Sequence, residues 1–404
     1  MFQFIVSPLM VSFFREPLKV FLSLIPLILV RDLCASSGDM AWLTVLKTVS
    51  PFLGFLGIFA CSVTKAHTHP VYLIGFLGIT AHLPFFSLFF LQATPTIILS
   101  ILLIYFSVMK TLFPYWVETL HVLYQEKRFK VWTKIQSYEY LLSIFLAPFF
   151  GWVLDRRHLS FSSLLLQLTL WSLFGLVIQV LLVNKECSLQ KHFKKDDNTL
   201  LSISELFPLF WGNMFLVRFH VIFFFVGSGM LVFKMIIPLF LAPFKEALTY
   251  TKFWAFSLWG RALGGYLVSL VGSNFFCHNP FFALNWLILL ALSELACFHF
   301  LVASDGKSSS FLGLTFFLDG VVIAGSRLIW DLSPTIFSQS VVSRHYTQLN
   351  LFMNGLRGLL IPGLTAFLLS CNQYLNWMIA IFLLYCFGLI LAMRSSLKKN
   401  KFLN

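Results

Sequence analysis

Long apolar stretches alternate with short polar ones along nearly the whole chain. Each apolar stretch is about 20 residues or longer, the length that an α-helix needs to cross the hydrocarbon core of a bilayer. One longer polar stretch, NKECSLQKHFKKDDNT at 184–199, divides them into two groups of six. The pattern predicts twelve transmembrane helices, near residues 17–37, 41–63, 71–92, 96–122, 134–154, 160–183, 209–241, 250–272, 280–303, 310–341, 348–370 and 375–393.

The two groups resemble each other in sequence. IPLILV (25–30) returns as IPLFLA (237–242), 212 residues later, and Trp116 and Trp330 are separated by 214 residues. Such a near-constant offset indicates a duplicated six-helix unit, a plan in which substrate binds near the bilayer midplane between the repeats. We therefore expect an all-α membrane protein with two pseudo-symmetric six-helix bundles, at 1–183 and 207–404, joined by a cytoplasmic loop at 184–206.

Composition excludes a soluble protein. The chain of 404 residues is 58% hydrophobic and 11% charged, and its mean hydropathy is +0.85. A soluble domain of this size has no interior large enough for so much apolar surface. Lipid must therefore cover much of the chain.

The net charge of +13 is concentrated in the short polar segments, which favours a membrane topology signal over nucleic-acid binding. With both termini in the cytoplasm, sixteen Lys and Arg residues fall on the cytoplasmic side and six on the opposite side, as the positive-inside rule requires. Arg156 and Arg157 are the chief exceptions. The expected location is a cell membrane, with the bacterial inner membrane favoured, and the expected state is a monomer.

The sequence lacks motifs for other chemistry. Seven cysteines without a C-x-x-C pair predict buried thiols rather than a disulfide framework, and His67 and His69 have no further metal ligands nearby. The chain contains no G-x-x-x-x-G-K-[ST], no H-E-x-x-H and no recognisable Ser/His/Asp pattern. We therefore expect no catalytic residues, no metal, no cofactor and no enzyme activity.

Two passages resemble the major facilitator superfamily of secondary transporters. EKRFKVWTKIQSYEYLLSIFLAPFFGWVLD (126–155) is similar to that family's passage from helix four to helix five, and SRHYTQLNLFMNGLRGLLIPGLTAFLL (343–369) to the equivalent passage of the second half. The resemblance implies six plus six helices, alternating access between two bundles, and a cavity lined by helices one, four, seven and ten. The chain departs from the family in the loop after helix two, where GIFACSVTKAHTHP (57–70) keeps only Lys65 as a basic residue.

Charged side chains within the apolar segments are the candidate site residues, because an ionisable group at membrane depth is costly unless it faces a cavity or a partner. Lys110 and Arg327 fall at similar depth in the two repeats, and two such cations favour an anionic ligand. The expected substrate-binding residues are Lys110, Arg327, Lys234, Arg31, Trp116 and Trp330. Proton coupling is expected at Asp319 and Asp32, and gating at Glu139 and Arg357.

Structural roles remain open for several of these residues. Lys110 alternatively pairs with an acid on a neighbouring helix and holds the bundle together, Arg357 alternatively serves helix packing, and Glu139 alternatively stabilises an interface. Glu294 lies in the ninth segment, outside the helices that the resemblance assigns to the cavity.

The sequence favours a secondary active transporter for a small anionic or zwitterionic metabolite, driven by a proton gradient or by exchange with a counter-substrate. Two alternatives remain. One is a membrane-embedded lipid-processing enzyme or flippase, and the other is a transport-inactive sensor or scaffold of the same fold. The altered loop after helix two keeps this last alternative open.

Overall fold

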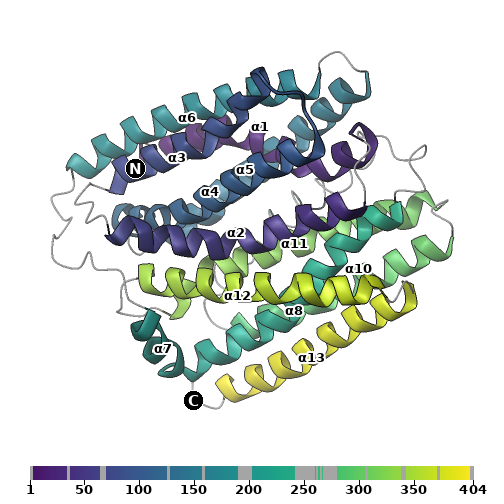
Figure 1. Cartoon of the computed structure of the whole chain (residues 1–404). Coiled ribbons are helices and arrows are strands. Elements are labelled where there is room, and N and C mark those ends of the chain that lie inside the picture. Colours follow the sequence, from purple (N-terminus) through teal and green to yellow (C-terminus); the bar gives the residue numbers. More distant parts are fainter. Residues whose placement is uncertain are drawn as a thin grey trace.

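The computed structural model describes residues 3–33, 37–63, 70–124, 128–156, 160–189, 203–241, 260, 263, 266, 280–304, 308–337, 343–370 and 374–400 (Figure 1). Every regular element within these residues is a helix. In chain order they are α1 (Gln3–Arg31), α2 (Ser37–Val63), α3 (Pro70–His82), the 3₁₀ helix η1 (Leu83–Phe89), α4 (Pro95–Tyr124), α5 (Arg128–Asp155), α6 (Phe161–Leu189), α7 (Ile203–Trp211), α8 (Met214–Leu241), α10 (Pro280–Ala303), α11 (Ser309–Phe337), α12 (Ser343–Ser370) and α13 (Tyr374–Asn400).

Most predicted segments coincide with one long helix each, and the third is α3 continued by η1. The predicted segment at 250–272 lies outside the described residues, apart from Gly260, Leu263 and Tyr266. Among the described residues, eight helices are long and apolar enough to cross a membrane. The chain is a multi-pass membrane protein.

The predicted first and seventh segments differ from the structure in ways that affect the site, and other boundaries differ by a few residues, as at α6, which continues to Leu189 beyond the predicted end at 183. The first helix begins at Gln3 rather than near residue 17, so Glu16 and Lys19 lie inside α1 and not at its start. The seventh segment is broken into α7 and α8, because the Asn213 side-chain oxygen accepts hydrogen bonds of 3.1 Å from the backbone N–H groups of Phe215 and Leu216. This is the N-cap arrangement that starts a new helix.

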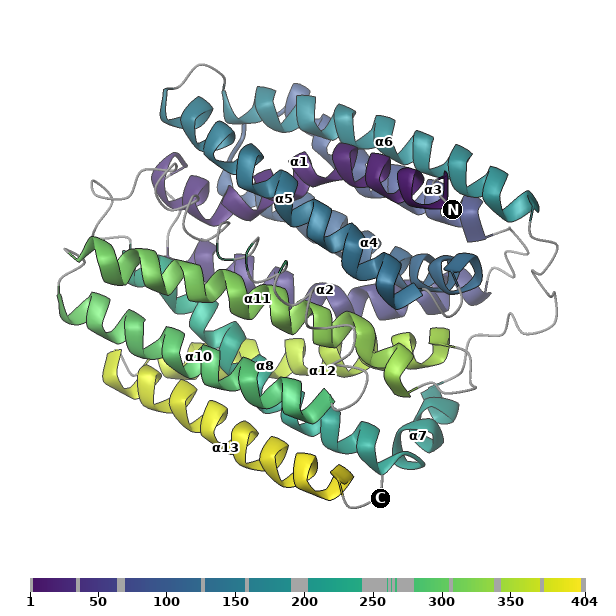
Figure 2. The same cartoon turned by 180° about the vertical axis from the view of Figure 1, so that it is seen from behind.

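The helices form two groups that lie on opposite sides of the molecule (Figures 1 and 2). Helices α1, α3, α4, α5 and α6 make up one group, with Leu18, Phe21 and Leu165 completely buried in its core. Helices α8, α10, α11 and α13 make up the other, with Phe219, Phe281 and Tyr385 in its core. The exact domain limits at 183 and 207 remain predictions.

Helices α2 and α12 run side by side between the two groups (Figure 1). They approach closely at Gly355, where an added Cβ would lie 2.7 Å from the Cα of Phe52. Nearby, the rings of Phe55 and Phe352 are 5.1 Å apart. Small residues permit this kind of approach in membranes, where association depends on packing rather than on expulsion of water.

We expect Gly355→Ala to destabilise the protein by about 1–3 kcal/mol, the usual cost of forcing atoms into a packed core. The clash is with the backbone of α2, which cannot rotate away as a side chain can. The measurement is the thermal unfolding midpoint in detergent. Gly325→Ala is the matched control, since among the described residues a Cβ there meets only the flexible end of Leu287, at 3.0 Å. Equal shifts for both variants would contradict the close-approach argument.

Candidate functional site

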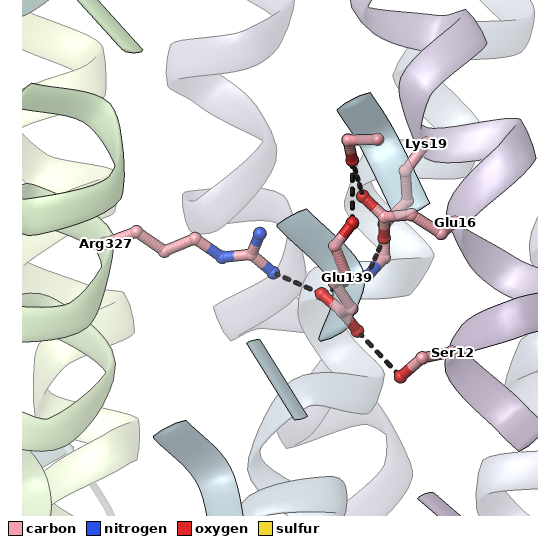
Figure 3. A network of polar contacts seen from close by, with 6 residues as sticks. Ser12, Glu16, Lys19, Glu139 and Arg327 are labelled. Atoms are coloured by element: carbon pink, nitrogen blue, oxygen red, sulfur yellow. Dashed lines mark hydrogen bonds and ion pairs between the residues drawn. The ribbon is translucent and has the colours of Figure 1, made fainter. Parts of the chain in front are cut away.

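Four charged side chains from α1, α5 and α11 form a connected network between the two groups of helices (Figure 3). Lys19 Nζ lies 3.2 Å from Glu16 Oε2 and 2.9 Å from Glu139 Oε2. Arg327, from α11, places Nη2 4.0 Å from the same Glu139 oxygen. Each of these residues lies near the middle of its helix. The network therefore joins the two halves of the chain close to the centre of the molecule.

Two serines hold the carboxylates in place. Ser12 donates to Glu139 Oε1 at 3.3 Å, and Ser143 donates to Glu16 Oε1 at 2.9 Å. Ser12, Glu16 and Lys19 share one face of α1 because they are four and three residues apart. Glu139 and Ser143 are four residues apart on α5, so the helical period alone brings these groups to one surface.

The network is balanced in formal charge, with two carboxylates and two cations. The exposed fraction of the side chains increases from α1 toward α11: Glu16 is 9% exposed, Glu139 14% and Arg327 43%. A half-exposed pair at 4.0 Å contributes about 0–1 kcal/mol. The ion pair between Arg327 and Glu139 is thus the weakest interaction of the network, as expected of a contact that breaks and re-forms.

An apolar contact accompanies the ion pair between α5 and α11. Tyr140, next to Glu139, packs against Ala324, which lies one helical turn before Arg327. The offset of 214 residues that relates Trp116 to Trp330 also relates Lys110 to Ala324. In the structure, Ala324 packs against α5. The Cβ of Lys110 faces α2, where a Cβ on Gly54 would lie 2.5 Å from it, and its Nζ lies 6.0 Å from the Phe113 ring centroid. That Lys110 and Arg327 bind one ligand together remains a prediction.

Arg357, which is 8% exposed, lies in a second polar cluster between α8, α11 and α12. Its guanidinium donates to the Phe223 carbonyl at 3.2 Å and to the Asn354 side chain. The guanidinium carbon lies 5.3 Å from the Phe223 ring centroid and 5.9 Å from that of Trp330. A Cβ on Gly227 would lie 1.7 Å from Arg357 Nη1, so only glycine leaves room for this arrangement.

Aromatic rings wall the Arg357 cluster. Phe223 and Trp330 are 4.1 Å apart, and the His220 ring lies 5.6 Å from Trp330. His220 Nε2 and Arg357 Nε are buried without a hydrogen-bond partner among the described residues. The structure therefore brings together Trp330, expected to bind substrate, and Arg357, expected to act as a gate. It adds His220, which the sequence did not single out.

The remaining candidates are dispersed. Trp116 packs against Ile74, Leu77, Leu112 and Tyr115, which places it within the first group of helices. Asp32 is exposed directly after α1, with its N–H bonded to the Ile28 carbonyl at 2.9 Å. Arg31 is the last residue of α1, and its side chain lies outside the described atoms. Lys234 and Asp319 lie in the second group, close to Glu294. The functional roles of all of these remain predictions.

Sequence reasoning missed Glu16 and Lys19 as site residues. The charges in REPLK were placed at the cytoplasmic edge because the first apolar segment was drawn from residue 17. A signal was nevertheless present: Glu and Lys three residues apart match neighbouring positions on a helix surface. Glu139, by contrast, was expected to act in gating, although the sequence did not show which residues it contacts; its gating role remains a prediction.

The comparisons with known proteins address the fold. The chain matches no protein-family model. No curated protein matches it either. Among solved structures, the crystal structure of a mutant of the nucleoside transporter NupG is similar over 97% of this chain and 98% of that one, with a TM-score of 0.59 and 12% sequence identity. The predicted fold class, an all-α major-facilitator-like membrane protein, is confirmed.

Proposed function

We propose that the protein is a secondary active transporter that moves a small anionic or zwitterionic metabolite by alternating access. The observation that carries this proposal is the central network, in which Arg327 of one half reaches Glu139 of the other. Such a contact is broken when two bundles rock apart and re-formed when they close. Its low strength lets a ligand compete for it.

An anionic ligand has a direct way to engage this site. A carboxylate or phosphate that entered between the halves would compete with Glu139 for the partly exposed Arg327 guanidinium. Displaced from Arg327, Glu139 still has Lys19 at 2.9 Å and Ser12 at 3.3 Å. Binding would thus uncouple the two halves without leaving a carboxylate unpaired, which links occupancy to movement.

A nucleoside is a second candidate substrate. The fold resembles that of a nucleoside transporter, and the neighbouring rings of Phe223 and Trp330, whose centroids are 4.1 Å apart, offer an aromatic surface on which a planar base could lie. The remaining parts of the proposal are a bacterial inner-membrane location, cytoplasmic termini, a monomeric state and coupling to a proton or a counter-substrate. A lipid-processing enzyme and a transport-inactive sensor are the alternatives.

The test is uptake into proteoliposomes from a panel of labelled dicarboxylates, sugar phosphates, amino acids and nucleosides. We expect an anionic or zwitterionic compound to accumulate, and Arg327→Gln to reduce its uptake about tenfold or more, equivalent to about 1.4 kcal/mol. Lys134→Gln, which removes an exposed cation from α5, is the matched control. Uptake of uncharged nucleosides alone, unaffected by Arg327→Gln, would favour the second candidate; binding without uptake would favour a sensor.

A further inference from the structure

A small polar cavity lies inside the first group of helices, between α1, α3, α4 and α6. Its polar lining side chains, among the described residues, are Arg15, His82, Ser172 and Gln179, and the rest of the wall is glycine, isoleucine, leucine and methionine. The cavity offers about 10 Å³ to the centre of a water-sized particle, which is room for a single particle of that size. The space is therefore too small for a metabolite and suits one ion or one water molecule.

Gln179 is the unsatisfied group of this cavity. Its side chain is 1% exposed, and neither its amide oxygen nor its amide nitrogen has a hydrogen-bond partner among the described residues. Such atoms are rare in folded proteins, because burial removes their water and only another partner can replace it. Gln179 also lies within the candidate span Phe161–Leu181, where the bilayer supplies no water. An unpartnered amide that lines a cavity at this depth indicates a binding site.

The other two buried polar side chains of the wall are already bonded to protein. His82 Nδ1 lies 2.7 Å from the Gly78 carbonyl and donates to it, since a carbonyl can only accept. In the neutral ring Nε2 is then an acceptor, and the Ser172 hydroxyl donates to it at 3.0 Å. These bonds join α3 to α6 beside the cavity. The binding capacity of the wall therefore rests on Gln179 and Arg15.

Arg15 gives the cavity a positive charge. No Asp or Glu lines the cavity in the described part of the chain. The two carboxylates of the central network pair with Lys19 and Arg327, and no ion pair within the described residues joins them to Arg15. A guanidinium has several N–H donors and no acceptor, and the Gln179 amide nitrogen adds further donors. A water molecule accepts some of these hydrogen bonds but leaves the charge uncompensated, whereas an anion meets both needs.

We propose that this cavity binds one small inorganic anion, chloride or another halide, between the Arg15 guanidinium and the Gln179 amide. A halide is a single atom close to a water molecule in size, and it accepts N–H hydrogen bonds from any direction. Phosphate and organic acids are too large for the space. The site lies between α1, α3, α4 and α6, whereas the central network joins α1, α5 and α11. It is therefore separate from the proposed substrate site and goes beyond the proposed transport function.

The bound anion holds α1 against its neighbours in the first group. Helices α1 and α6 are already in close contact here, because a Cβ on Gly175 would overlap the Cβ of Phe14. Arg15 directly precedes Glu16, which pairs with Lys19 in the central network. The anion and the network therefore act on the same turn of α1 from two directions. With the anion in place, α1 stays with α3 and α6 when the contact between the halves opens.

Equilibrium binding of radiolabelled chloride to the purified protein in detergent tests the proposal directly. Gluconate replaces chloride to keep the ionic strength constant. We expect saturable binding for which bromide competes and sulfate, being larger, does not. The thermal unfolding midpoint should rise with chloride concentration, because a ligand that binds only the folded state stabilises it.

Gln179→Glu is the decisive variant, since it keeps the shape of the side chain and changes its charge. Chloride binding should fall about 100-fold or more, because a carboxylate at this position repels the anion and neutralises Arg15. The variant should stay folded, with a midpoint that no longer responds to chloride, because the carboxylate itself supplies the counter-charge. Arg15→Met should also abolish binding. Gln167→Glu makes the same change at an exposed glutamine of α6 and is the matched control, with binding retained.

The outcomes that contradict the proposal are equally specific. A folded wild-type protein without saturable chloride binding overturns it and leaves the cavity to an ordered water molecule. Binding that survives Gln179→Glu or Arg15→Met in a folded variant overturns it as well. If Arg327→Gln abolishes that surviving binding, the anion lies in the central network instead. No transported compound is needed, so the result is independent of whether the protein proves to be a transporter.

Discussion

Glu139→Gln should lower the free energy of unfolding by about 2–3 kcal/mol and slow transport at least tenfold. Glu139 is the central acceptor of the network, with Lys19 at 2.9 Å, Arg327 at 4.0 Å and Ser12 at 3.3 Å. Removing one partner of a fully buried ion pair costs about 3–5 kcal/mol. The expected cost is lower here because the Lys19 side chain is 28% exposed and Arg327 43%, so water compensates part of the lost charge.

The comparison with Arg327→Gln makes this prediction specific. Arg327 forms a half-exposed ion pair with Glu139 at 4.0 Å, so the loss of this ion pair should change stability by only about 0–1 kcal/mol while still impairing transport. Thermal unfolding in detergent and proteoliposome uptake are measured for both variants and for the double variant. If the two single variants were equally unstable, or if Glu139→Gln transported normally, the network would be a structural interface rather than part of the transport cycle.

The fold could be predicted from the sequence because the signal was repeated many times. Apolar stretches of spanning length, a polar centre and a duplicated pattern all lead to the same arrangement. The predicted helix boundaries were wrong where charged residues lie inside a helix. The charges at Arg15 and Glu16 suggested that the first helix starts after them, yet α1 runs through both from Gln3, with Glu16 hydrogen-bonded to Ser143 of α5. A partner more than 100 residues away leaves no local trace in the sequence.

The candidate site was predicted only in part for the same reason. Arg327, Glu139, Trp330 and Arg357 were all recognised from their charge or aromatic character within apolar segments. Their grouping was not, because it depends on the rotation of each helix about its axis. Arg327 lies toward α5 and Glu139, whereas Trp330, three residues further along α11, lies against Phe223 of α8. Adjacent positions on one helix thus belong to two different clusters.

Substitution of Arg357 can show whether a buried cation serves transport or only helix packing. Its hydrogen-bond partners in the described part of the chain are the Phe223 carbonyl and Asn354, and no carboxylate is among them. Burying a guanidinium without a counter-charge is expensive. A residue needed only to fill this space between α8 and α12 would be better served by an apolar side chain of similar volume.

We therefore expect Arg357→Met to leave the free energy of unfolding unchanged or to raise it by up to about 1–4 kcal/mol, since replacing buried charges with packed apolar groups often stabilises a protein. The thermal unfolding midpoint should accordingly stay the same or rise. Transport should nevertheless fall about 100-fold, equivalent to about 2.7 kcal/mol in the barrier. Arg218→Met is the matched control: Arg218 is a partly buried cation on α8, 6.0 Å from the Phe215 ring, outside both clusters. A destabilised Arg357→Met that transports normally per folded molecule would assign Arg357 to helix packing. A stable but inactive variant would instead indicate that the protein retains this buried charge for an anionic ligand or for the movement of α12 against α8 and α11.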